Sequence, residues 1–296
     1  MRLRARTAAR ACSPGRAPLD LRAVSRFSDC FLLLFGQLAV GGLAGLAVPP
    51  FTVLDRGFYR SSAGIFLGFA LLFVAGKVAL LVRAGAVTSA DAGELALWVA
   101  FTAALGTYLA SLWSDSNVLR ARSFAAGLLL GILALAVSAL RFRLDPAGSL
   151  ATLLYPIAFV TGALVLGAVA GGMLLGHWYL IDLGLSIDPL RRVFRYFVAV
   201  LIVQLAFSLL MVLALGLGSS QGAAAVADLW HEHAALLALR VVLGPLAALG
   251  IAYLIHRSLE IPQTMAATGL FYIAILAVLV GELLGRLILF RTSLPL

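Results

Sequence analysis

The chain has 296 residues, of which 62% are hydrophobic and 12% charged, and its mean hydropathy is +1.06. A soluble domain of this length needs a far more polar surface, so the composition excludes that class and indicates a chain embedded in lipid. The net charge of +9 raises the question of a nucleic-acid partner, but the basic residues lie mainly in the N-terminal segment and the loops, where they direct membrane topology. We expect no nucleic-acid partner and a protein surrounded by membrane lipid.

Residues 1–28 are rich in arginine and precede the first apolar run. They lack the apolar stretch and the small-residue cleavage site of a signal peptide. We predict a basic, disordered tail over 1–28, and a cytoplasmic anchor that fixes the topology is an equally supported alternative. The rest of the chain, 29–296, is predicted to form one transmembrane domain.

Apolar segments recur along this domain, each near the roughly 20 residues that a helix needs to cross the hydrocarbon core. Eight are predicted, at 29–49, 62–83, 92–113, 123–141, 151–178, 193–217, 234–255 and 265–289. Short connections leave no room for a soluble domain, so the predicted fold class is all-α, a polytopic transmembrane helical bundle. Glycine pairs spaced by four residues, such as Gly41/Gly45 and Gly281/Gly285, favour close packing between the helices.

Cysteine and histidine positions give little support for a metal site. Cys12 and Cys30 are too few for an iron–sulfur cluster, which needs about four ligands. His177 and His256 end their spans at one membrane face and are candidate haem ligands, but an interfacial histidine is ordinary at a helix end, so we expect no haem or other metal. The segment GSSQGAAAVADLWHEH, which contains His231 and His233, is predicted to be a solvated loop.

Charged residues inside the spans are the main functional signal, because each costs about 2.5–3.5 kcal/mol at the centre of a bilayer. Successive spans run in opposite directions, so the position of a residue within its span gives its depth in the membrane. By this measure, six charged residues fall toward the face that holds the N-terminus: Lys77, Arg83, Glu94, Arg240, Glu282 and Arg286. Gln37, about a third of the way along the first span, joins this group.

Glu282 and Arg286 are four residues apart, which places them on one helix face in the order that favours an ion pair. Arg286 is close enough to the helix end to reach the interface, whereas the shorter Glu282 is predicted to face the bundle or a cavity. Glu94 is a second acid at similar depth, and Lys77 and Arg240 balance the charge. Such a site suits a quinol, which has an apolar tail and a head that loses two protons on oxidation, because a carboxylate accepts protons. A structural ion pair is the alternative for Glu282 and Arg286.

Three spans carry short glycine-containing motifs. The first has Phe35-Gly36-Gln37 followed by Gly41-Gly42, the fifth has Gly171-Gly172-Met173-Leu174-Leu175-Gly176, and the eighth has Gly281-Glu282-Leu283-Leu284-Gly285-Arg286 before Phe290. In these motifs, in the eight spans and in total length, the chain resembles the membrane-anchor subunit of dimethyl sulfoxide reductase-type molybdoenzymes. Glu94 stands where that family has a glutamate opening the third helix. The family's histidine at the end of the second helix is absent, since this chain reads Leu81-Val82-Arg83-Ala84-Gly85.

The resemblance implies an integral anchor in the bacterial cytoplasmic membrane that oxidises menaquinol and is not itself the catalytic subunit. It implies two partners, an iron–sulfur subunit that receives the electrons and a molybdopterin catalytic subunit. Under this reading, Gln37, Lys77, Glu94, Arg240, Glu282 and Arg286 are the candidate quinol-binding residues. A standalone membrane protein, either a small-solute transporter or a structural bundle, is the alternative.

The orientation depends on whether the basic tail is counted. With the tail included, the arginine distribution places the N-terminus inside the cell. Without it, more arginines lie in the loops that follow odd-numbered spans, which places the N-terminus outside. The family resemblance also implies an external N-terminus, and we therefore expect that orientation.

Overall fold

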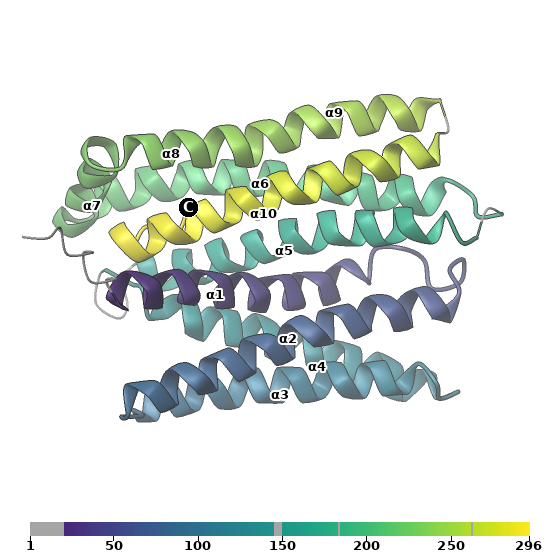
Figure 1. Cartoon of the computed structure of the whole chain (residues 1–296), viewed down its shortest axis with the longest axis horizontal. Coiled ribbons are helices and arrows are strands. Elements are labelled where there is room, and N and C mark those ends of the chain that lie inside the picture. The colour runs from purple at the N-terminus through teal and green to yellow at the C-terminus, as the bar shows by residue number, and fades with distance from the viewer. Residues whose placement is uncertain (1–20, 145–149, 183, 262) are drawn as a thin grey trace, which may run out of the picture.

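The computed structural model describes residues 21–144, 150–182, 184–261 and 263–296, and it describes the side chains of these residues except those of 21–27 and 151. Within these ranges every regular element is a helix, as the predicted all-α fold class requires (Figure 1). Residues 1–20, which make up most of the predicted basic tail, lie outside the described residues, and so does Cys12.

The helices lie roughly parallel to a common direction (Figure 1). Their bounds are α1 Leu21–Gly45, α2 Arg56–Ala84, α3 Ser89–Ser111, α4 Asn117–Leu140, α5 Ala151–Trp178, α6 Asp188–Gly218, α7 Ser220–His231, α8 Ala234–Val241, η1 Val242–Leu246, α9 Ala247–Glu260 and α10 Thr264–Thr292. Eight segments within the described residues are long and apolar enough to cross a membrane, with α8, η1 and α9 together forming the seventh. The predicted spans are therefore confirmed, and the chain is a multi-pass membrane protein.

Several helices begin before the apolar run that revealed them. The second span was expected from residue 62, but α2 begins at Arg56, where the side chain of Asp55 accepts a hydrogen bond from the backbone N–H of Gly57. The described part of the first helix likewise extends ahead of residue 29, from Leu21 onward. Hydropathy marks the part of a helix that lies in lipid, whereas capping groups decide where the helix itself begins.

The predicted solvated loop before the seventh span is wrong in its secondary structure. Most of GSSQGAAAVADLWHEH forms the helix α7, whose N-cap, Ser219, accepts a hydrogen bond from the N–H of Gly222 over 3.0 Å. Alanine favours helix strongly enough to override the polar character of the segment. His231 ends this helix, and the ring of His233 lies 4.0 Å from the carboxylate of Asp228.

The seventh span is not a regular α-helix. A π-helical turn, η1, follows Arg240 and Val241 and contains Pro245, which has no N–H to donate. The N–H of Ala247 reaches back five residues to the carbonyl of Val242, the spacing of a π-turn. This widened turn separates α8 from α9 and lies immediately after Arg240.

The spans divide into two halves of the same design. Helices α1 to α4 pack in sequence, each against the next, and so do α5, α6, α9 and α10, while α1 and α5 join the halves at the centre (Figure 1). The packing of α4 on α5 mirrors that of α10 on α1. Because each half has an even number of spans, α1 and α5 cross the membrane in the same direction.

The central contact between α1 and α5 is made by backbone. A Cβ atom placed on Gly41 would overlap the carbonyl of Ala163, and one placed on Gly167 would overlap the carbonyl of Gly41. Only glycine permits this approach, which brings two helices of the core into direct backbone contact. The predicted role of Gly41 in close helix packing is confirmed.

Candidate functional site

Five of the six charged residues that the sequence placed at one level, all except Arg83, lie in two clusters, one in each half. The first, here called the Glu94 cluster, comprises Lys77 on α2, Asp91, Glu94 and Trp98 on α3, and Ser138 and Arg141 at the end of α4. The second, the Glu282 cluster, comprises Gln204 on α6, Arg240 on α8, and Glu282 and Arg286 on α10. Each cluster thus draws on the second, third and fourth spans of its own half.

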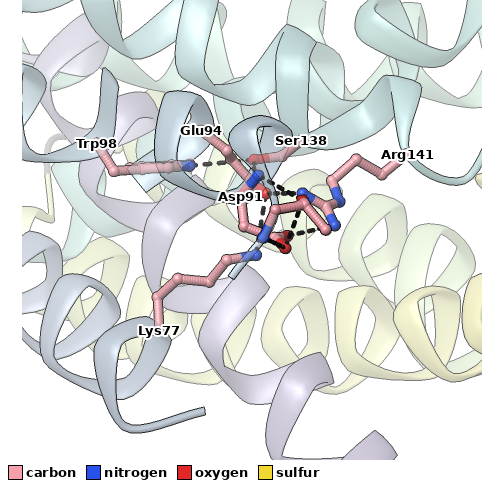
Figure 2. A network of polar contacts seen from close by, with 7 residues as sticks. Lys77, Asp91, Glu94, Trp98, Ser138 and Arg141 are labelled. Carbon is pink, nitrogen blue, oxygen red and sulfur yellow. Dashed lines mark hydrogen bonds and ion pairs between the residues drawn. The ribbon is translucent and has the colours of Figure 1, made fainter. Parts of the chain in front are cut away.

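Glu94 is the centre of the first cluster (Figure 2). Its Oε2 accepts hydrogen bonds from Lys77 Nζ at 3.0 Å and from Arg141 Nη1 at 3.1 Å. Its Oε1 accepts one from the hydroxyl of Ser138 at 2.6 Å, and that hydroxyl in turn accepts one from Trp98 Nε1 at 3.0 Å. The carboxylate is 3% exposed, so these partners replace the water that a buried charge loses.

Asp91 connects this cluster to the start of α3. Its carboxylate pairs with Arg141 and accepts hydrogen bonds from the backbone and the hydroxyl of Thr88, the N-cap. Thr88 accepts a hydrogen bond from the Asp91 N–H in return, which completes a capping box. Arg141 therefore binds two carboxylates, and the cluster holds two positive and two negative groups.

A cavity of about 170 Å³, here called the Glu94 cavity, adjoins this cluster. Its polar lining residues include Lys77, Glu94, Ser138 and Arg141, and Asp29 on α1 adds a second carboxylate. Apolar side chains complete the wall: Leu32, Leu33, Phe73, Leu80, Phe142 and Phe290. Among the side chains that the structure describes, none forms an ion pair or hydrogen bond with that of Asp29.

Glu282 is the centre of the second cluster and is almost fully buried. Its Oε1 accepts hydrogen bonds from Gln204 Nε2 at 2.6 Å and Arg240 Nη2 at 2.8 Å, and its Oε2 accepts one from Arg286 Nη2 at 2.9 Å. Arg286, 2% exposed, also lies over the ring of Phe159, with 5.0 Å from its guanidinium carbon to the ring centroid. Neither Glu282 nor Arg286 lines the Glu94 cavity.

Glycines shape the space around these charges. An added Cβ atom would lie 3.1 Å from Arg240 Nη1 if placed on Gly281 and 2.9 Å from Arg240 Nε if placed on Gly285, and one on Gly244 would overlap the guanidinium. On α5, a Cβ on Gly162 would lie 2.8 Å from Glu282 Oε2. The spacing of Gly281 and Gly285 in GELLGR thus admits an arginine from the neighbouring span, in addition to the close helix packing that the sequence predicts.

The two clusters differ in charge. The side chains of the Glu282 cluster set two guanidinium groups against one carboxylate, an excess of one positive charge among the side chains. Within the described residues, Nε of Arg240 and both Nε and Nη1 of Arg286 are buried without a hydrogen-bond partner. In the Glu94 cluster, by contrast, Lys77 and Arg141 balance Asp91 and Glu94.

Two other polar residues expected at this level, Gln37 and Arg83, lie outside the two clusters. Gln37 is buried beside the second cluster, where its Nε2 donates to the carbonyl of Phe159 at 2.9 Å. Arg83 ends α2 apart from both clusters and lines a separate surface depression. The six candidate quinol-binding residues therefore do not form one site, because Lys77 and Glu94 belong to the first cluster and the others lie in or beside the second.

The candidate haem ligands have other neighbours. Nδ1 of His177 lies 3.2 Å from the hydroxyl of Tyr272, whereas the ring of His256 stacks on Phe194 and lies 3.5 Å from the carboxylate of Glu260. His256 lines a surface pocket that Asp188, Arg191 and Arg195 also line. The two imidazoles thus have different neighbours, His177 on α10 and His256 on α6 and within α9.

Sequence reasoning missed several members of both clusters. Four of them lie near span ends, where polar residues are common and do not indicate a functional site: Asp29, Asp91, Ser138 and Arg141. Gln204 offered a clearer signal, since it is an amide in an otherwise apolar stretch of the sixth span.

Comparisons of the chain with family models, with curated proteins and with solved structures found no match.

Proposed function

We propose that the chain is the quinol-interacting membrane anchor of a respiratory oxidoreductase and that it binds menaquinol in the Glu94 cavity. In this proposal the electrons pass to a partner iron–sulfur subunit, which serves a molybdopterin catalytic subunit. The anchor lies in the bacterial cytoplasmic membrane with its N-terminus outside. The observation that supports the proposal is the composition of the cavity, which combines two carboxylates and two cations with apolar walls near one end of the bundle.

The cavity walls match the two parts of a quinol head. Phe73, Phe142 and Phe290 offer aromatic surface to a flat ring. The hydroxyl groups of the ring need acceptors, which carboxylates supply, and the oxidised carbonyl groups need donors, which Lys77 and Arg141 supply. One cavity thus holds partners for both redox states of the ligand.

Oxidation of a quinol releases two electrons and two protons. The electrons leave to the iron–sulfur clusters of the partner, and the protons require bases beside the ring. Asp29 is the more available acceptor, because Glu94 already accepts hydrogen bonds from three side chains. We assign proton uptake to the Asp29–Glu94 pair, and we assign Lys77 and Arg141 to orienting the ligand.

Glu282 has a different part in this proposal. Its carboxylate is saturated by Gln204, Arg240 and Arg286, and it stands apart from the Glu94 cavity. We therefore assign it to holding α6, α8 and α10 together instead of to the proton step.

Fluorescence of Trp98 tests the proposal. Trp98 is fully buried, and its ring centroid lies 4.0 Å from that of Phe73 in the cavity wall. Its indole N–H donates a hydrogen bond to the hydroxyl of Ser138. In a variant that retains only this tryptophan, with Trp113, Trp178 and Trp230 changed to Phe, a short-chain naphthoquinone should quench the emission saturably. Asp29→Asn and Glu94→Gln should weaken binding or turnover of the quinol, whereas Glu260→Gln at the opposite end of the bundle should leave both unchanged.

Co-purification tests the rest of the proposal. Mild detergent extraction from the native host should retain an iron–sulfur subunit. A chain that purifies alone, and whose Trp98 emission does not respond to the quinone, would instead be a standalone membrane protein.

A further inference from the structure

A second pocket lies beside the Glu282 cluster, on the side of the molecule away from the Glu94 cavity. It has a volume of about 220 Å³ and is formed by α6, α7, α8 and η1, together with Leu296. Its polar lining residues are Gln204, Ser208 and Arg240, and the rest of its lining is apolar. We call it the Arg240 pocket.

The pocket faces the surroundings of the bundle. Leu205 and Leu209 on α6 are 38% and 63% exposed, and Trp230 on α7 is 59% exposed. In a membrane protein such apolar exposure on a spanning helix is directed at lipid. A molecule can therefore reach the pocket sideways from the bilayer.

The charge of the adjoining cluster defines what the pocket accepts. The Arg240 side chain is 92% buried, yet the side chains of its cluster carry one excess positive charge and include buried guanidinium N–H groups without partners. A buried charge without a counter-ion is unfavourable, and an anion is the group that offsets it. Arg240 lines the pocket, so an anion bound there would lie beside a guanidinium group within otherwise mostly apolar walls.

Depth gives the second constraint. Arg240 lies six residues after the start of α8, about 9 Å along the helix axis. That distance places the guanidinium near the boundary between the lipid head groups and the hydrocarbon. Trp230, an aromatic residue of the kind that favours this boundary, lies in the same pocket.

We propose that the Arg240 pocket binds an anionic lipid, with its phosphate or carboxylate directed toward Arg240 and its acyl chain along Leu205, Leu209 and Val212. The inference is independent of the quinol proposal, since it rests on a different cluster in the other half of the bundle. The widened turn at Pro245 adjoins this site, because both Val241 and Pro245 form part of the pocket wall.

Trp230 makes the proposal measurable. In a variant that retains only this tryptophan, lipids with brominated acyl chains are added at low mole fraction to detergent-solubilised protein. We expect brominated phosphatidylglycerol to quench Trp230 at about tenfold lower concentration than phosphatidylcholine with the same chains, because a charge-assisted hydrogen bond contributes about one decade of affinity. Brominated oleate serves as a third probe, which separates a phosphate head from a simple carboxylate.

Two variants decide whether the preference belongs to the pocket. Arg240→Gln should remove the preference for the anionic lipid. Val212→Phe, which fills the pocket but leaves the charged cluster intact, should weaken quenching, whereas Val203→Phe on the lipid-exposed side of the same helix should not.

The inference is overturned if both phospholipids quench equally, or if Val212→Phe binds the anionic lipid as the parent does. It is also overturned if a neutral naphthoquinone itself quenches Trp230 saturably and an excess of unbrominated phosphatidylglycerol does not relieve that quenching, since the pocket would then select a ring and not a charge. The Glu94→Gln variant should leave all these readings unchanged, so failure here is distinct from failure of the quinol proposal.

Discussion

Arg240 and Glu282 join the seventh and eighth spans through a hydrogen-bonded ion pair, with 2.8 Å between Nη2 and Oε1. The pair exists because glycines on both helices leave room for the guanidinium beside the backbone. Gly281 adjoins Glu282 in the sequence, and Gly285 adjoins Arg286, so the motif supplies both the charges and the space for a third charge. This relationship explains why GELLGR lies in an apolar helix.

The charge imbalance of this cluster gives a testable asymmetry. Glu282→Gln leaves two buried guanidinium groups without a counter-ion, and we expect it to lower the free energy of unfolding by about 3–5 kcal/mol. Arg286→Gln leaves one arginine with one carboxylate and should cost clearly less. Thermal unfolding in detergent measures both, and equal losses would show that the excess charge is neutralised by a group outside this cluster.

Gly281→Ala should destabilise the bundle by about 1–3 kcal/mol, because the added methyl group meets the backbone at Gly244 as well as the guanidinium of Arg240. Gly269→Ala on the same helix is the matched control. A Cβ there has no neighbour within 4 Å, and alanine favours helix, so this variant should be as stable as the parent or slightly more so. The same unfolding measurement compares them, and equal stability of the two variants would contradict the close approach.

Ser138 holds two buried groups at once, the carboxylate of Glu94 and the indole N–H of Trp98. Ser138→Ala leaves both without this partner and should cost about 1–3 kcal/mol. Ser123→Ala on the same helix should cost little, since the Ser123 hydroxyl donates only to carbonyl groups of its own helix. Chemical denaturation, monitored by Trp98 fluorescence, compares the stability losses of the two variants. Equal losses would show that water replaces the Ser138 hydroxyl as the partner of Glu94 and Trp98.

The expected orientation is tested with single cysteines in a chain whose Cys12 and Cys30 are replaced. Ser186→Cys, in the connection between α5 and α6, and Val87→Cys, between α2 and α3, lie at opposite ends of the bundle and are both exposed. With the N-terminus outside, an impermeant thiol reagent added to intact cells should label Val87→Cys and spare Ser186→Cys. The reverse pattern would place the N-terminus inside.

The sequence predicted the spans because a segment that crosses the bilayer must form a sufficiently long apolar helix, and such a segment is visible in the hydropathy. The sequence also predicted which residues lie at the same depth in the membrane, because successive spans run in opposite directions. In the structure Lys77 contacts Glu94 and Arg240 contacts Glu282, as shared depth allows. The ion pair of Glu282 with Arg286 followed from helical spacing alone.

Lateral arrangement was the part that the sequence did not reveal. Hydropathy does not indicate which helices are neighbours. The sequence therefore predicts a single site for polar residues that share one membrane depth, whereas the structure divides them between the Glu94 cluster and the Glu282 cluster. Gln204 illustrates the difficulty, because its partner Glu282 is remote in the chain and belongs to a helix that does not follow α6. The helix α7 was missed for a different reason, namely that its polar ends masked an alanine-rich centre.

The division of charges between the halves bears on how the chain enters the membrane during synthesis. Lys77, Asp91, Glu94 and Arg141 neutralise one another within the first four spans, so that half can settle in lipid while the second is still being made. Arg240 is in a different position, because its counter-charge, Glu282, lies in the eighth span and is translated after the seventh. Until α10 emerges, the seventh span must keep its arginine at the membrane surface or beside an anionic lipid, so that completion of the second half depends on α10.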